Sequence, residues 1–315
     1  MNALSSLDLN ALVAFDAVAQ QGGFTAAAEQ LGVTKTKVSL QISRLEAALD
    51  TSLFTRTTRQ VHLTDAGQAL HAQCGPLLHR LQDALDRSGS GRAGLGGTLR
   101  LGTTVDHAVQ SLGPAIARFA ELHPSLRIDL RTNDRVANLV GEGIDVAVRM
   151  GWLRDSSLHA AKLGEFRQCV VAAPRLAQQV GRPAHPSDLA SFEWIALSLL
   201  PAPLTWKFSA RDGSTQTVQV KSRIRVDSTG ALRAMLREGA GISVLDEPSA
   251  ADDLRSGQLV RLLDGWSLPQ GGIYAVYPPG RHVSAKIRAF VDFYREYLRS
   301  DSYRARIDPA RRTPV

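Results

Sequence analysis

Apolar residues recur at helical spacing through the N-terminal part of the chain. An amphipathic helix is expected over residues 7–21, and the glycine pair that follows should end it. A short helix capped by Thr25 should come next and stop at Gly32, and a further helix should begin at the N-cap Thr34. The apolar positions of this last helix share one face, at Val38, Ile42, Leu45 and Leu49. Two short helices joined by a glycine-containing turn are the sequence form of a helix-turn-helix.

The polar face of the second of these helices carries cations where a helix disfavours them. Lys35 and Lys37 fall in its first turn, where the positive end of the helix dipole opposes a cation by about 0.3–1 kcal/mol. A DNA phosphate would supply the missing anion, and neighbouring polar side chains could bond to base edges or backbone. The candidate DNA-contacting residues here are Thr34, Lys35, Thr36, Lys37, Ser39, Gln41 and Arg44. On spacing alone, an ordinary solvated helix face remains the alternative.

Beyond this helix the pattern becomes alternating and then helical again. Residues 51–64 are rich in threonine and arginine, with alternating apolar positions, which predicts a two-stranded wing. Arg56 and Arg59 would lie near its tip, placed for phosphate or minor-groove contact, or only as solubilising charges of an edge strand. Residues 65–88 should form a long helix, whose apolar stripe would face a partner helix or pack within the chain (Leu70, Cys74, Leu77, Leu78, Leu81 and Leu85).

The remainder of the chain has the pattern of an α/β protein. A glycine- and serine-rich hinge at residues 89–97 precedes strands and helices that alternate over residues 98–150. This alternation implies a parallel sheet that binds ligands at the carboxyl ends of its strands. A second lobe with a β-rich insert at residues 205–226 should follow. The last strand and helix, within residues 273–298, would return to the first lobe and complete a two-lobed clamshell.

Several stretches of the sequence resemble one family. Residues 24–67 (FTAAAEQLGVTKTKVSLQISRLEAALDTSLFTRTTRQVHLTDAG) resemble, without a gap, the N-terminal domain of the LysR-type transcriptional regulators. Pieces of the α/β half resemble the effector domain of the same family, a fold shared with periplasmic binding proteins (GGTLRLGTT, LVGEGIDVAVRMG, SSLHAAKLGEF, HPSDLA and ALRAMLREGAGISVL). One position departs from the family. After Val38 and Ser39 a polar or basic residue is usual, whereas this chain has Leu40, which could pack on a thymine methyl or take no part in readout.

The resemblance covers about residues 7–298 and implies an α/β fold class with a winged helix-turn-helix and a two-lobed effector domain. The expected parts are the DNA-binding domain (1–64), a linker helix for dimerisation (65–88), the hinge (89–97), the periplasmic-binding-protein-like effector domain (98–299) and a disordered tail that matches nothing (300–315). The partners implied are double-stranded DNA with a dyad-symmetric site, further copies of the chain in a dimer and a tetramer, a small-molecule effector and RNA polymerase.

Candidate effector-binding residues lie where the predicted strands end. Thr103 and Thr104 precede a helix, where hydroxyl and free N–H groups suit an anion, although the carboxylate of Asp106 would repel one. Thr104 or Asp106 could equally be only an N-cap. The remaining candidates are two arginines that could bind a carboxylate or form surface ion pairs, and two serines of the other lobe: Arg131, Arg149, Ser198 and Ser228.

The sequence contains nothing that predicts catalysis or a cofactor. It has no GxSxG, HExxH, Walker or CxxC motif. The glycines of residues 89–94 match GxGxxG, but a helix precedes them and a strand follows, the reverse of a dinucleotide site. The acidic pair Asp252 and Asp253 is expected on a solvated helix face. With only Cys74 and Cys169, which are far apart, neither a metal site nor a redox-sensing thiol pair is expected.

Composition and charge exclude some classes of protein but do not identify a function. The net charge of +7 is weak evidence for DNA binding, because the charges of residues 1–64 balance to zero. Part of the excess lies in the C-terminal tail, where Arg304, Arg306, Arg311 and Arg312 outnumber Asp301 and Asp308. The absence of a signal peptide and of any membrane-length apolar run predicts a cytoplasmic protein without membrane contact. The rival interpretation is a small-molecule-binding α/β module without specific DNA binding, and the candidate recognition helix argues against it.

Overall fold

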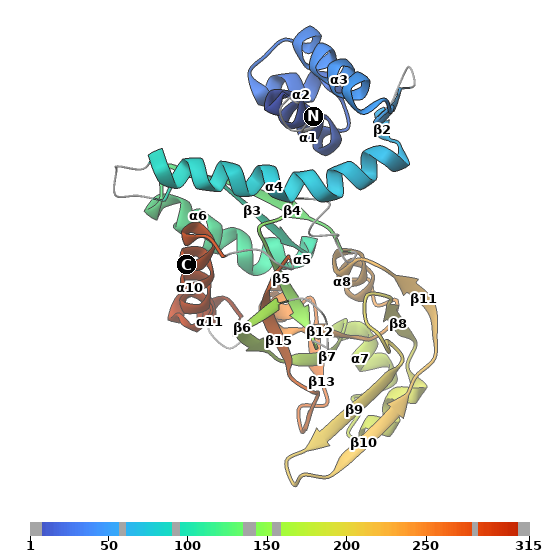
Figure 1. The fold of residues 1–315 in the computed structure, drawn as a ribbon. Coiled ribbons are helices and arrows are strands. Elements are labelled where there is room, and N and C mark those ends of the chain that lie inside the picture. The colour runs from blue at the N-terminus through green and yellow to red at the C-terminus, as the bar shows by residue number, and fades with distance from the viewer. Residues whose placement is uncertain are drawn as a thin grey trace. The chain divides into compact units, whose positions relative to one another are not determined.

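The computed structural model describes residues 8–56, 61–89, 95–134, 143–152, 159–278 and 283–307. The chain divides into two compact units, one formed by residues 1–97 with 138–144 and the other by residues 98–137 with 145–315 (Figure 1). Each unit has its own hydrophobic core. Within the described residues, no helix is both long and apolar enough to cross a membrane.

The first unit begins with three short helices, α1 (Leu9–Gln21), α2 (Phe24–Leu31) and α3 (Lys35–Leu49). Their apolar faces meet in a core whose fully buried members include Phe15, Val38 and Ile42, each 0% exposed. Full burial of such a side chain stabilises the fold by about 1.5–3 kcal/mol relative to exposure. The helices therefore hold one another in place through the apolar positions that the helical period predicted.

The ends of these helices follow local sequence signals, with one exception. Thr34 is the N-cap of α3, and its hydroxyl oxygen accepts from the Lys37 backbone N–H at 3.3 Å, which confirms the predicted cap. Gly32 ends α2 in the left-handed conformation at φ 64°. The predicted cap at Thr25 is wrong: Gly23 is the N-cap, and Thr25 lies inside α2. The extended backbone of Gly23 starts the helix at Phe24, which packs into the core.

A short antiparallel pair and a long helix complete the first unit. Strands β1 (Phe54–Arg56) and β2 (Val61–Leu63) pair as the predicted wing. Helix α4 (Asp65–Gly89) follows, and the Thr64 hydroxyl oxygen caps it by accepting from the Gly67 N–H at 3.0 Å. The N-terminal half of α4 packs on α1. In this contact the His71 Nε2 lies 3.1 Å from the Asp16 Oδ1.

The first lobe of the second unit is built on a five-stranded sheet with strand order β4-β3-β5-β15-β6. Strands β3 and β5 are parallel, whereas β15 runs antiparallel to β5 and β6, so the sheet is mixed. The lobe also contains the helices α5, α6 and α10 and a π-helical turn at Ala108–Leu112. The bounds are β3 (Gly97–Thr103), α5 (Val105–His107), α6 (Gly113–Leu122), β4 (Leu126–Thr132), β5 (Val146–Gly151), β6 (His159–Phe166), β15 (Gly271–Tyr277) and α10 (Ala285–Arg299).

The second lobe contains a three-stranded sheet of order β12-β7-β13 and the strand pair β11-β8. A bridge between Trp194 and Ile242 lies beside them, and a further three-stranded sheet has the order β10-β9-β14. Its bounds are β7 (Gln168–Ala172), α7 (Pro174–Val180), a 3₁₀ turn (Pro186–Ser191), β8 (Trp194–Leu197), β9 (Thr205–Ala210), β10 (Thr215–Gln219), β11 (Ser222–Val226), α8 (Thr229–Arg237), β12 (Ser243–Asp246), α9 (Glu247–Ser256), β13 (Val260–Leu262) and β14 (Trp266–Ser267). β15 and α10 then return to the first lobe as predicted.

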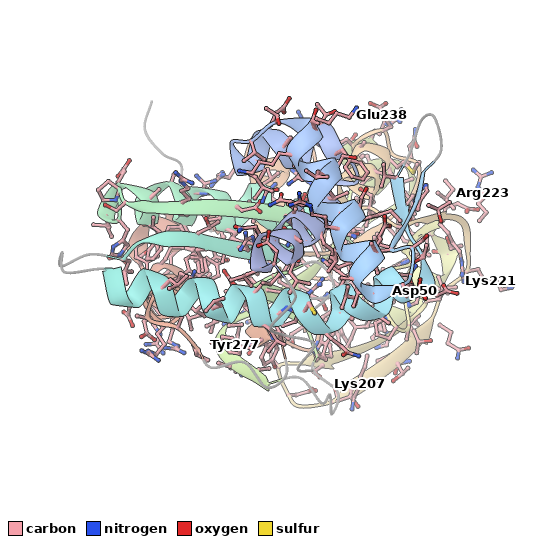
Figure 2. All side chains as sticks on the ribbon, turned by 45° about the horizontal axis from the view of Figure 1, so that its top comes forward. Asp50, Lys207, Lys221, Arg223, Glu238 and Tyr277 are labelled. Carbon is pink, nitrogen blue, oxygen red and sulfur yellow. The ribbon has the colours of Figure 1, made fainter. Side chains whose placement is uncertain are left out.

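Exposed cations lie along β9 and β11 of this lobe. Lys207, Lys221 and Arg223 point away from the ribbon (Figure 2). The Arg223 Nε lies 3.5 Å from the Glu193 carboxylate, and both side chains are largely exposed. Charges along β11 discourage unwanted pairing of its open side with another strand.

Residues 301–307, in the tail that the sequence predicted to be disordered, form a helix. Helix α11 (Asp301–Ile307) follows α10, and its Tyr303 is only 4% exposed. The Tyr303 ring lies 5.6 Å from that of Tyr297, and the Arg255 guanidinium donates to the Arg306 carbonyl at 2.7 Å. Burial of an aromatic ring offsets the entropy cost of ordering this segment. Residues 308–315, like the helix that the pattern predicts at 136–141, lie outside the described residues.

Candidate functional site

The first turn of α3 presents positive charge at the positive end of a helix. Thr34, Lys35, Thr36 and Lys37 are all exposed, and the first turn contains no acidic residue. The free N–H groups of the turn and the two ammonium groups therefore point to the same solvent. This arrangement suits a phosphate oxygen, which could accept from both kinds of donor.

The remaining candidate residues of α3 differ in exposure. Leu40 is 50% exposed and Arg44 is exposed, while Ser39 and Gln41 are half-buried beside the core face. The structure thus brings the candidate DNA-contacting residues together on one helix, with Val38 and Ile42 fixing its opposite face in the core. Of the two wing candidates, Arg56 ends β1 but its side chain is not described, and Arg59 lies outside the described residues.

Glu46 holds the turn that leads from α3 to the wing, a role that the sequence analysis missed. Its carboxylate accepts from the backbone N–H of Leu53 at 2.8 Å and of Phe54 at 3.3 Å. Asp50 ends α3 in the left-handed conformation at φ 48°, which turns the chain toward β1. Such a carboxylate looks from sequence like any surface acid of a helix, because its partners come from a later segment.

The candidate anion site after β3 is occupied by the chain's own groups. Thr103 is buried, and its hydroxyl donates to the Val148 carbonyl at 3.0 Å, which ties β3 to β5. Thr104 precedes α5 without a side-chain capping bond. The Val105 N–H donates instead to the Asp134 Oδ1 at 2.9 Å. A ligand carboxylate at this helix end would therefore compete with Asp134.

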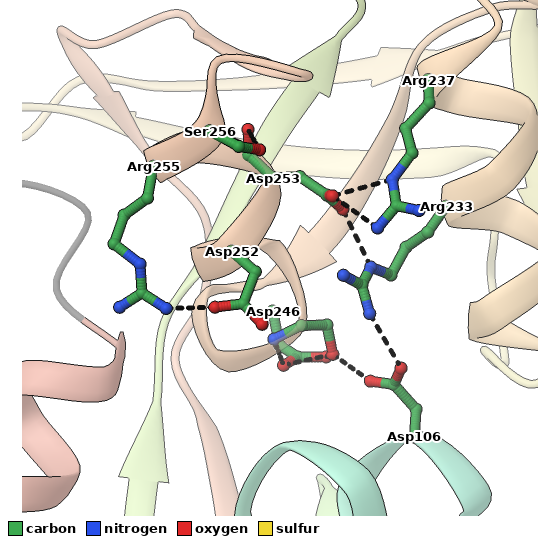
Figure 3. Close-up of polar contacts among 9 residues, drawn as sticks. Asp106, Arg233, Arg237, Asp246, Asp252, Asp253, Arg255 and Ser256 are labelled. Atoms are coloured by element: carbon green, nitrogen blue, oxygen red, sulfur yellow. Dashed lines mark hydrogen bonds and ion pairs between the residues drawn. The ribbon is translucent and has the colours of Figure 1, made fainter. Parts of the chain in front are cut away.

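Asp106 belongs to a polar network between the two lobes (Figure 3). From α5 of the first lobe, its carboxylate accepts from the Ser249 hydroxyl of α9 and lies 3.7 Å from the Arg233 Nη1 of α8. The Arg233 Nε in turn donates to the Asp253 Oδ2 at 3.0 Å. An unbroken set of charged contacts therefore joins α5 to α8 and α9.

The expectation that Asp252 and Asp253 form a solvated face is wrong for one of them. Asp253 is 2% exposed and also accepts from the Arg237 Nε at 2.7 Å. Asp252 is exposed and pairs with Arg255 on its own helix. The two neighbours differ because successive residues of a helix point about 100° apart, which turns Asp253 toward the arginines of α8.

Two carboxyl groups share the Ser249 hydroxyl. The Ser249 Oγ lies 2.8 Å from the Asp246 carboxylate and also contacts the Asp106 carboxylate. Burial, together with the nearby Asp106, raises the pKa of Asp246 to about 6, and burial also raises the pKa of Asp106. One hydroxyl hydrogen does not fully satisfy two ionised carboxylates that also repel each other, so the site favours an additional proton on one carboxyl group.

The remaining effector candidates lie at strand ends but have mainly structural partners. The Arg131 Nη2 is 3.3 Å from the Asp129 carboxylate on the same strand, and Arg149 is half-buried on β5. The Ser198 N–H donates to the Val226 carbonyl at 2.8 Å, although its side chain is exposed. Ser228 is the N-cap of α8, and its hydroxyl oxygen accepts from the Ala231 N–H at 3.4 Å.

Burial shifts the pKa values of two potentially reactive side chains, His107 and Cys169. Burial lowers the pKa of His107 to about 4, so the ring is neutral, and its Nε2 lies 2.9 Å from the Tyr294 hydroxyl. Burial raises the pKa of the Cys169 thiol to about 12, so the nucleophilic thiolate does not form at neutral pH. Among the described residues, no group of three or more His, Cys, Asp or Glu side chains could hold a metal ion.

Both parts of the chain match family models. Residues 9–68 match the bacterial regulatory helix-turn-helix protein, lysR family, and residues 92–299 match the LysR substrate binding domain. The chain is 41% identical over 301 residues to the HTH-type transcriptional regulator PtxR of Pseudomonas aeruginosa, with 96% of each chain covered. It is 34% identical over 300 residues to an HTH-type transcriptional regulator of Xanthomonas campestris pv. campestris, covering 94% of this chain and 87% of the relative.

Solved structures share this architecture over about nine tenths of the chain. The full-length Vibrio cholerae virulence activator AphB, a member of the LTTR protein family, aligns with a TM-score of 0.59 at 27% identity, covering 91% of this chain and 98% of that chain. CrgA, a LysR-type transcriptional regulator from Neisseria meningitidis, aligns with a TM-score of 0.58 at 28% identity, covering 92% and 99%.

Proposed function

The chain belongs to the LysR-type transcriptional regulators, and on this premise we propose how it reads DNA and responds to an effector. It is a DNA-binding transcriptional regulator with an effector-binding domain, and not an enzyme. The rival interpretation, an α/β module without DNA binding, is dropped because residues 9–68 match the helix-turn-helix of this family.

We propose that α3 enters the major groove, with Lys35 and Lys37 on phosphates and the adjoining side chains on base edges. The observation that carries this proposal is the exposed, acid-free first turn of α3, which places two lysines where the helix dipole opposes them. A bound phosphate reverses the sign of that interaction. Arg56 and Arg59 of the wing are the expected contacts to the neighbouring backbone.

The oligomer in this proposal forms through α4. Leu77, Leu81 and Leu85 recur every fourth residue and are 58%, 41% and 58% exposed within the first unit. Covering this stripe with the same stripe of a second copy removes it from water. The dimer would place two α3 helices in successive major grooves of a dyad-symmetric site, about 34–36 Å apart. A tetramer would contact two such regions.

The proposed effector response uses the lobe contact at Asp106. A small molecule that binds one arrangement of the lobes better than the other shifts the population toward it. The strand-end residues Thr104, Arg149 and Ser198 remain the candidates for contacting the molecule. The Asp106–Arg233 ion pair joins the two lobes, so a change in their arrangement would change this contact. RNA polymerase is the proposed further partner, and the cytoplasm, where the DNA lies, is the proposed place of action.

A nuclease footprint on the DNA upstream of the protein's own gene, with excess competitor DNA, tests this function. Protection in two patches with symmetric half-sites is the expected result. Uniform coverage that disappears as salt is raised would mean phosphate attraction only, and would overturn the proposed sequence-specific recognition.

A further inference from the structure

The outermost residue of α3 is a leucine. At about 100° per residue, Leu40 lies about 200° round the helix from Val38, which is fully buried in the core. The Leu40 side chain is 50% exposed and is not among those that form or pack against the core of α1, α2 and α3. Thr36, Lys37, Ser43 and Arg44 surround it on the same face, and all four are exposed. Leu40 is therefore an exposed apolar side chain among exposed polar neighbours, on the face of α3 opposite Val38.

The chemistry of the major groove narrows what such a side chain can bind. Base edges there present hydrogen-bond donors and acceptors, and the one apolar group is the C5-methyl of thymine. Leucine offers neither donor nor acceptor. Against guanine or cytosine it would remove water from the O6 or N4 group without replacing the lost hydrogen bond. Against thymine it covers a methyl group and leaves those polar groups alone.

We propose that Leu40 reads the C5-methyl of a thymine at one position of each half-site. This inference rests on the proposed entry of α3 into the major groove. Lys37 and Arg44, one turn to either side, would anchor the helix on the backbone and leave Leu40 facing the base edges. Leu40 then selects thymine at one base pair while the surrounding contacts supply most of the affinity.

Deoxyuridine substitution tests the proposal, because uracil differs from thymine only by the missing methyl. The full-length protein first selects its site from random DNA, and each thymine of a half-site is then replaced, together with its symmetry mate. The dissociation constant of wild type should rise at one position by about fourfold per half-site, or about fifteenfold for both, the value of one buried methyl group. Leu40→Ala should bind the thymine and uracil sites equally.

Leu49→Ala is the matched control. Leu49 belongs to the same helix and is 38% exposed, but it lies on the core side, so this variant should keep the full thymine preference. A preference that survives in Leu40→Ala would overturn the inference, as would a wild type insensitive to every substitution. If no site is selected at all, the proposed DNA recognition fails as well, which separates the two failures.

Discussion

Asp253 and Arg237 form an ion pair in which the carboxylate is almost fully buried. The Asp253 Oδ1 accepts from the Arg237 Nε at 2.7 Å, while its other oxygen accepts from the Arg233 Nε at 3.0 Å. Arg233 also contacts Asp106 of the first lobe. Asp253 therefore takes part in the packing of α8 on α9 and, through Arg233, in the contact between the lobes.

Asp253→Ala should lower the free energy of unfolding of the second unit by about 3–5 kcal/mol, because it leaves the largely buried Arg233 with Asp106 as its remaining acidic partner. Denaturant unfolding of the full chain measures the loss. Asp252→Ala is the matched control, since Asp252 is exposed and its pair with Arg255 lies within one helix. That variant should change the free energy of unfolding by no more than about 1 kcal/mol. Equal effects of the two variants would contradict the buried network.

Asp246→Asn should flatten the pH dependence of stability between about pH 4 and pH 6. The folded-state pKa of Asp246 is about 6, whereas an unfolded aspartate titrates near 3.9. The folded state therefore binds this proton more tightly than the unfolded state does. The contribution of Asp246 to the free energy of unfolding is largest below pH 4 and decreases as the pH rises through 6. Over this range the contribution of Asp246 to the free energy of unfolding decreases by about 3 kcal/mol.

The comparison is the difference between wild type and variant in the free energy of unfolding at each pH, so that other groups cancel. Asparagine retains an oxygen to accept from the Ser249 N–H, which now lies 2.9 Å from the Asp246 carboxylate. A constant difference from pH 4 to pH 7 would show that Asp246 titrates normally.

Leu77→Asp with Leu81→Asp should dissociate the oligomer, because the exposed stripe of α4 would then carry charge into the helix contact. Ala69→Asp with Ala72→Asp is the control: both alanines are exposed on the same helix, and Ala72 lies about 180° round it from Leu81. The mass by analytical ultracentrifugation should fall only for the leucine variant. An unchanged mass would remove α4 from the proposed interface.

Glu46→Ala should loosen the wing and weaken DNA binding without any contact of Glu46 with DNA. It leaves the N–H groups of Leu53 and Phe54 without their carboxylate acceptor, which costs about 1–3 kcal/mol. Amide hydrogen exchange should accelerate at these two residues. Glu29→Ala, at an exposed position of α2, should leave their exchange unchanged. Unaltered exchange in Glu46→Ala would contradict the positioning role.

Local signals in the sequence account for much of the DNA-binding unit. Thr34 as a cap and Gly32 as a stop need only their immediate neighbours, and the structure confirms both. The helical period likewise separates Val38 and Ile42 in the core from the exposed lysines. The predicted N-cap at Thr25 is wrong because Gly23 and Thr25 are both acceptable N-cap residues, and the burial of Phe24 favours a helix that begins earlier.

Contacts between distant segments account for what the sequence could not predict. Asp253 appears solvated until α8 brings Arg233 and Arg237 against it. Helix α11 lacks an apolar stripe, and its order depends on Tyr303 packing beside Tyr297. The position of a residue at a strand end likewise does not reveal that Thr103 and Ser228 have hydrogen-bond partners within the protein.

The DNA affinity of Lys37→Glu, compared with that of Lys207→Glu, tests whether α3 is the recognition helix. Lys37 lies in the first turn of α3, whereas Lys207 is an exposed lysine of β9 in the other unit (Figure 2), so the two variants change net charge equally. Fluorescence anisotropy on the footprinted DNA, in excess competitor, gives both dissociation constants, and sedimentation confirms the oligomer. Lys37→Glu should lose specific binding, whereas Lys207→Glu should retain it. Equal affinities for the two variants would contradict the assignment of α3 as the recognition helix.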